Sequence, residues 1–153
     1  MLGKLNNDQI ANVLQSQTIG RIACADGGKV YVLPISYAFD NGYVYGHSME
    51  GLKIKIMRTN PRVCFQVDSI ENMTNWRSVL AWGEYEEMKQ KDEYESGMRI
   101  LNNRLAPFIT SAATQSHQEN ENILHNYEEK GRRILVFRIK ILEQSGRFEK
   151  SHL

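Results

Sequence analysis

This sequence has little excess charge, few cysteines and no long apolar run. Its 19 Lys and Arg residues nearly balance 18 Asp and Glu residues, which leaves a net charge of +1. Proteins that bind nucleic acids usually carry a surplus of basic residues, so we expect no nucleic-acid partner. No stretch is apolar for long enough to cross a bilayer, and residues 1–8 lack the apolar run of a signal peptide. We therefore expect a cytoplasmic protein without membrane contact.

Cysteine and histidine are too few or too scattered for disulfide or metal chemistry. The two cysteines, Cys24 and Cys64, each lie in an apolar run typical of a strand, which favours buried thiols. His117 and His125 stand in a polar segment, at a spacing that matches no common set of metal ligands. The sequence thus predicts neither a disulfide nor a metal site.

The length of 153 residues is enough to bury one core without a covalent staple, and no repeat or boundary divides residues 1–153. We expect a single domain. The turn residues of 26–29 and 40–42 predict two hairpins, so the first half is expected to be an antiparallel meander. Runs rich in β-branched and aromatic residues predict strands over 19–25, 30–39, 43–47, 62–68, 76–88 and 134–142.

Short helices are expected between these strands. Asn6 or Asn7 can cap a first helix, and helical spacing of apolar residues predicts two more over 52–59 and 91–105. The polar segment 110–126 is interpreted as a loop. Six or so antiparallel strands with short helices indicate a closed or partly closed barrel, an α+β fold that is mainly β.

The richest chemistry lies where the strand 43–47 meets the helix that follows it. His47 and Ser48 end the strand, and Lys53 falls in the first turn of the helix. A helix N-terminus offers unpaired N–H groups, which with a hydroxyl and a lysine make a phosphate site. A simple cap beside a solvated lysine explains the same residues, and the pattern alone favours that plainer interpretation.

Several short motifs, taken together and in order, resemble the pyridoxamine-phosphate-oxidase-like FMN-binding split-barrel family. The motifs are Val32-Leu33-Pro34-Ile35-Ser36-Tyr37, Tyr45-Gly46-His47-Ser48, Gly51-x-Lys53, Asn60-Pro61-Arg62-Val63 and Arg77-Ser78-Val79 with Gly83. They are most similar to the branch that includes the 5-nitroimidazole-resistance proteins. The resemblance covers residues 20–88 and implies an antiparallel split β-barrel, Greek-key-like, that binds FMN.

The resemblance also implies a role for each matching position. The isoalloxazine ring would lie along Leu33, Pro34, Ile35, Ser36 and Tyr37, whose backbone groups would meet its polar edge. The ribityl-phosphate arm would contact His47 and Ser48, and the phosphate would pair with Lys53. Ser78 would place a polar side chain near the flavin. In this family the flavin lies at the interface of a homodimer, so we expect the partner subunit to complete the site.

The function implied is that of an FMN-dependent oxidoreductase acting on a small molecule, including nitro-aromatic compounds. His47 is the candidate catalytic residue, and a purely positioning role for it stays open. Relatives often carry a basic residue before the phosphate lysine, whereas this chain has Leu52. No arginine-rich C-terminal signature surrounds residues 146–148, so vitamin B6 oxidation is not expected. The alternative is a protein of the same fold that holds a flavin or haem without turnover.

Overall fold

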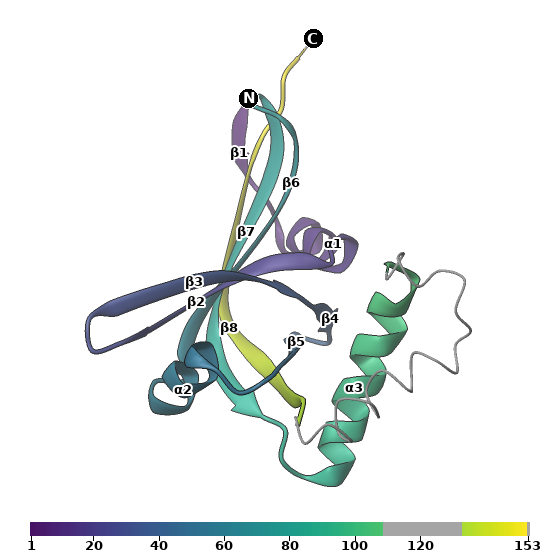
Figure 1. Cartoon of the computed structure of the whole chain (residues 1–153). Helices are drawn as coiled ribbons and strands as arrows, with labels where there is room; N and C mark the ends of the chain where they lie inside the picture. Colours follow the sequence, from purple (N-terminus) through teal and green to yellow (C-terminus); the bar gives the residue numbers. More distant parts are fainter. Residues whose placement is uncertain (109–132, 153) are drawn as a thin grey trace.

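The computed structural model describes residues 1–108 and 133–152. Within them, eight antiparallel strands form one sheet in the order β3-β2-β6-β7-β8-β5-β4, with β1 paired to β8 (Figure 1). The strands are β1 Leu2–Lys4, β2 Ile19–Asp26, β3 Lys29–Ser36, β4 Ala38–Asp40, β5 Tyr43–Ser48, β6 Arg62–Asn72, β7 Asn75–Glu87 and β8 Leu135–Glu149. The predicted fold, an α+β split barrel that is mainly β, is confirmed.

Helices α1 (Asn7–Ser16), α2 (Leu52–Thr59) and α3 (Lys91–Leu105) lie at the three predicted places, and a 3-10 turn at Ala106–Phe108 follows α3. Asn6 caps α1: its side chain accepts from the Gln9 N–H, and the Gln9 side chain accepts from the Asn6 N–H, both at 2.9 Å. This reciprocal pair satisfies two donors that the helix leaves unpaired. The second helix stops at Thr59, before Pro61, as predicted.

Both predicted hairpins are present, but the single strand predicted over 30–39 is wrong. The chain breaks at Tyr37, whose N–H donates to the Thr18 carbonyl at 2.9 Å. The fully buried Tyr37 hydroxyl donates to the Leu14 carbonyl at 2.7 Å. These two bonds hold Tyr37 inside the molecule and direct β4 away from β2.

The predicted meander is therefore also wrong. After the break, β4 pairs with β5, and β5 pairs with β8 rather than with β3. Strand β3 becomes an edge of the sheet, with β2 as its one neighbouring strand in the part of the chain that the structure describes. This separation splits the barrel and leaves one side of β3 without a ladder.

Three strand features differ from or refine the prediction. The last strand continues to Glu149 because β7 pairs with it along almost its whole length, although alternation of apolar residues ends near Leu142. Strand β1 was not predicted, since three residues carry no period. The predicted bend at Gly83 is a bulge: the β7–β8 register shifts between Trp82 and Gly83.

The main core fills the inner face of the sheet beneath α1 and α2, around the fully buried Phe65, Phe137 and Ile54. A second cluster, centred on Leu101 and Val136, packs α3 against β4, β5 and β8. The loop predicted over 110–126 lies outside the described residues. None of the described helices has the length and apolar character that a membrane span requires. The core thus fixes α2 against β2, where the predicted site begins.

Candidate functional site

The first turn of α2 offers backbone donors that no side chain occupies. Gly51 is the N-cap residue, and no side-chain hydrogen bond caps the helix there. The first N–H groups of a helix have no partner within the helix itself. Because Gly51 has no side chain, these donors and the positive end of the helix dipole remain accessible to an anion.

Lys53 stands in this first turn as a half-buried cation. Among the described residues no carboxylate lies within ion-pair distance of its ammonium group. Burial lowers the pKa of Lys53 below its ordinary value, and the buried Cys24 thiol on β2 partly opposes that shift. A half-buried, unpaired ammonium is costly, and an anionic ligand would remove that cost.

His47 and Ser48 end β5 beside this turn. His47 is exposed to solvent, yet nearby protein atoms, and then the positive charge of Lys53, lower its pKa. The Ser48 hydroxyl is half-buried and donates to the Met49 carbonyl at 2.8 Å. The structure therefore brings three predicted residues, His47, Ser48 and Lys53, to one place.

The predicted ring-binding segment on β3 alternates between two environments. Leu33 and Ile35 pack toward the core, whereas Pro34 and Ser36 are exposed. Tyr37 is fully buried with its hydroxyl and N–H already bonded, so its side chain faces the interior. What this segment can offer a ligand is the free edge of β3, because backbone groups on that edge have no partner strand.

Ser78 lies apart, on β7 and on the outer face of the sheet. Its hydroxyl accepts from the Gln66 amide at 3.1 Å, and the same amide donates to Asp68 at 2.9 Å. Arg21 reaches Asp68 from β2 at 3.4 Å. Ser78 thus belongs to a polar network on the face opposite to Cys24, and one chain does not bring it to Lys53.

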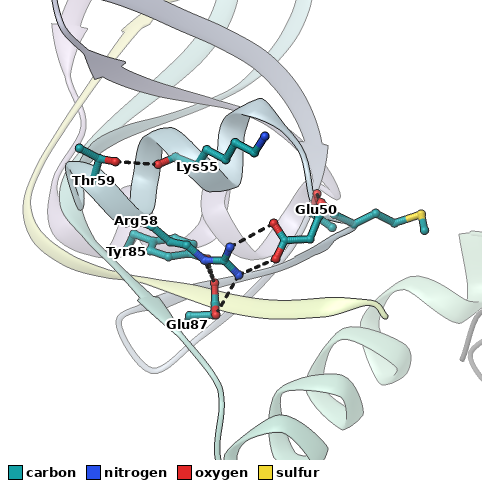
Figure 2. Close-up of polar contacts among 8 residues, drawn as sticks. Glu50, Lys55, Arg58, Thr59, Tyr85 and Glu87 are labelled. Carbon is teal, nitrogen blue, oxygen red and sulfur yellow. Dashed lines mark hydrogen bonds and ion pairs between the residues drawn. The ribbon is translucent and has the colours of Figure 1, made fainter. Parts of the chain in front are cut away.

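Sequence reasoning missed a cluster that holds the turn before α2. Figure 2 shows the Arg58 guanidinium between two carboxylates, at 2.8 Å from both Glu50 and Glu87. Tyr85 also donates to Glu87 at 2.8 Å. Arg58 and Glu87 are 29 residues apart, so no local pattern could have predicted the pair. The cluster ties Glu50, one residue before Gly51, to the end of β7.

Comparison with known proteins identifies the family. Residues 6–148 match the sequence profile described as pyridoxamine 5'-phosphate oxidase. The chain belongs to that family. The match spans nearly the whole chain and includes every predicted site residue, so the family predicted from short motifs is confirmed.

The chain is also similar to individual proteins at 30% identity or more. An FAD-binding protein from Mesorhizobium loti is 30% identical, with 98% of this chain and 99% of that chain covered and a TM-score of 0.76. An uncharacterized protein from Rhizobium meliloti is 32% identical over 84 residues, or 55% of this chain and 56% of the relative. The chain thus matches little more than half the length of that curated relative.

A more distant solved structure has the same fold. It is a candidate 5-nitroimidazole antibiotic resistance protein from Bacteroides thetaiotaomicron, 16% identical, with a TM-score of 0.70. The alignment covers 97% of this chain and 87% of that chain. At this identity the likeness shows the shared fold alone.

Proposed function

We propose that this protein binds the FMN unit of a flavin between the start of α2 and the free edge of β3. The observation that carries the proposal is the half-buried Lys53, unpaired among the described residues, in the first turn of a helix without a side-chain cap. The phosphate of FMN is the kind of anion that this arrangement would stabilise. The related protein from Mesorhizobium loti, which binds FAD, contains the same FMN unit in its ligand.

Different residues at the site would bind the phosphate and the ring of the flavin. Lys53 and the first N–H groups of α2 would hold the phosphate, with Ser48 redirecting its hydroxyl from the Met49 carbonyl. The free edge of β3 would meet the polar edge of the ring, and Pro34 leaves a gap in its donors there. Once bound, a flavin supplies hydride or single-electron chemistry, and the protein supplies orientation and electrostatics.

We further propose that the protein is a reductase of small electrophiles, with nitro-aromatic compounds as the first class to test. His47 has a depressed pKa, so its ring is neutral at pH 7 and can exchange a proton through a ring nitrogen. The same ring beside Lys53 also suits a purely positioning role toward the phosphate arm. Comparing the pH profile of turnover in the wild type and His47→Gln separates the two roles.

We propose a homodimer in which the outer face of the sheet is buried. Val32, Ala23, Cys64 and Trp82 lie directly opposite one another across β3, β2, β6 and β7, so they form one row on that face. Val32 is 59% exposed and Trp82 is 38% exposed. An apolar row of this length favours burial against a second copy. Ser78 and Pro34 lie on the same face, so the second subunit would adjoin both.

The first experiment is an absorbance spectrum of purified protein, repeated after FMN addition and desalting. We expect retained flavin bands in the wild type. Lys53→Ala should weaken FMN binding by about 10- to 100-fold, because a charge-assisted contact contributes about 1.5–3 kcal/mol. Lys55→Ala removes an exposed lysine two positions on, and should leave FMN binding unchanged.

The results of these experiments distinguish a flavin-dependent reductase from a flavin- or haem-binding protein without turnover. No retained flavin and no measurable affinity would overturn the proposal. Firm flavin binding without NAD(P)H-driven reduction of any acceptor would instead support the alternative, a flavin-binding protein without turnover. Haem bands in the purified protein would support the haem version of that alternative.

A further inference from the structure

The turn at residues 49–51 must keep a fixed shape if the first N–H groups of α2 are to hold a phosphate. Gly51 has an extended backbone there, with φ at 179° and ψ at −173°. A methyl group at Gly51 would meet no atom within 4 Å, so side-chain packing at this position cannot hold the backbone. Glycine also loses more conformational freedom on ordering than any other residue. The 49–51 turn therefore needs support from neighbouring residues.

Two side chains bond to this turn in the described parts of the chain. The Ser48 hydroxyl donates to the Met49 carbonyl at 2.8 Å, and the Arg58 guanidinium pairs with the Glu50 carboxylate. In the proposed function the Ser48 hydroxyl turns to the phosphate, so the first bond is lost. The second contact uses no group that the ligand would take. The pair of Arg58 and Glu50 is therefore the support that remains once a phosphate is bound.

Arg58 contacts its two carboxylates through different edges of the guanidinium group (Figure 2). Its Nε and Nη2 donate to the two oxygens of Glu87, at 2.8 and 3.2 Å. Its Nη1 and Nη2 lie 3.0 and 2.8 Å from the two oxygens of Glu50. A planar guanidinium can make two such paired contacts at once, whereas a lysine ammonium is a point charge without this fork. The contacts of Arg58 thus fix the orientation of Glu50 as well as its distance.

The contacts of Arg58 continue into the main core. Glu87 ends β7, and its carboxylate also accepts from the Tyr85 hydroxyl at 2.8 Å. Tyr85 is 8% exposed, and its ring centre lies 5.4 Å from that of the fully buried Phe137. A continuous set of contacts therefore runs from the core through Glu87 and Arg58 to the turn at Glu50.

We propose that Arg58 is a positioning residue that holds the 49–51 turn in the shape a flavin phosphate requires, so that the protein discriminates phosphorylated flavins from riboflavin. The proposal rests on the proposed function, because it takes the phosphate to lie at the start of α2. Arg58 does not itself bind the phosphate, since its guanidinium lies between the two carboxylates. A bare carboxylate at Glu50 would repel a phosphate, and Arg58 offsets that charge while it holds the turn.

The test compares FMN with riboflavin, which differ by the phosphate alone, in flavin fluorescence titrations. The main variant is Arg58→Lys, which keeps a positive charge in the last turn of α2 but cannot make both paired contacts. We expect its FMN affinity to fall about tenfold and its riboflavin affinity to stay unchanged. Tenfold corresponds to about 1.4 kcal/mol, on the order of the cost of ordering the backbone of one residue.

A second variant, Glu50→Ala, tests the sign of the effect. If charge alone matters, removing a carboxylate near the phosphate should tighten FMN binding. We expect weaker FMN binding instead, by about as much as in Arg58→Lys, because the turn loses its attachment. The matched control is Glu71→Ala, which removes an exposed carboxylate near the far end of β6 from α2 (Figure 1). This control should leave both affinities unchanged.

The possible failures separate this proposal from the proposed function. Equal losses of FMN and riboflavin affinity in Arg58→Lys would show that Arg58 supports the fold in general, and would overturn the positioning role. Unchanged FMN affinity in Arg58→Lys, or tighter FMN binding by Glu50→Ala, would also overturn it and leave the flavin site intact. A wild type that binds neither FMN nor riboflavin would overturn the proposed function and this proposal together.

Discussion

The pKa of His47 is lowered first by burial and then by the positive charge of Lys53. The residue types here could be predicted, since a strand ending in His-Ser before a helix with an early Lys is visible in the sequence. The proximity of Lys53 to Cys24 could not be predicted from the sequence, because it arises from the packing of α2 on β2.

This depressed pKa predicts how the stability of the ligand-free protein responds to acid. His47 resists protonation in the folded state but not in the unfolded chain, so the stability linked to its neutral form is present above pH 6.5. That stability is lost as the pH falls from about 7 toward 5. His47→Gln should flatten the unfolding free energy over this window in urea titrations, whereas His152→Gln, at the exposed C-terminus, should follow the wild type. A wild-type slope in the His47→Gln variant would contradict this.

The two carboxylates that pair with Arg58 differ in their exposure to solvent. The Glu87 side chain is 11% exposed, whereas that of Glu50 is 56% exposed. Glu87→Gln should lower the unfolding free energy by about 1 kcal/mol, because a sheltered charge-assisted pair is lost. Glu50→Gln should have a smaller effect, since exposed pairs contribute little. Equal losses of unfolding free energy in the two variants, measured by denaturant unfolding, would contradict this difference in exposure.

At the scale of elements, the strand limits that the sequence did not predict depend on contacts between residues far apart in the chain. Hairpin turns and helix ends were predictable because Gly27, Gly28 and Pro61 act on their immediate neighbours. The break at Tyr37 was not, since it depends on bonds to Leu14 and Thr18 about 20 residues earlier. The extension of β8 depends likewise on β7, which supplies its partners along the chain.

The bulge between β7 and β8 predicts a specific sensitivity at Gly83. A methyl group there would overlap the Lys140 carbonyl oxygen and approach Ile139 Cγ2 to 2.8 Å. Gly83→Ala should therefore lower the unfolding free energy by about 1–3 kcal/mol, the usual effect of overpacking. Gly51→Ala is the control, because a methyl at that position would meet no atom within 4 Å. Similar melting temperatures for the two variants would show that steric overlap at Gly83 is not what destabilises the protein.

At the scale of the whole molecule, the family and fold were predictable, whereas the placement of the site was only partly so. Ordered motifs over residues 20–88 were enough for the family. Ser78 lies on the outer face of the sheet, away from the start of α2, and sequence alone cannot say which face a residue occupies until the register is known. A second subunit against that face would account for the two separate groups of predicted residues.

The proposed dimer makes its own prediction. Val32→Glu puts a charge at an exposed position in the apolar row, so folding should be unaffected while the dimer is lost. Light scattering should then give the mass of one chain, with loss of bound flavin. Met73→Glu, at a 90% exposed position outside the row, should remain a dimer. A wild type that has the mass of a monomer, yet binds flavin, would contradict the interfacial site.

The free edge of β3 has a consequence for solubility. An unpaired strand edge invites strands of other molecules to add to the sheet, which leads toward fibrils. Pro34 stands in this edge strand and has no N–H to donate. It thus interrupts the ladder that an added strand would need, and Lys29 adds a charge where the strand begins. The missing donor at Pro34, which borders the proposed flavin site, should therefore also protect newly made chains from aggregation.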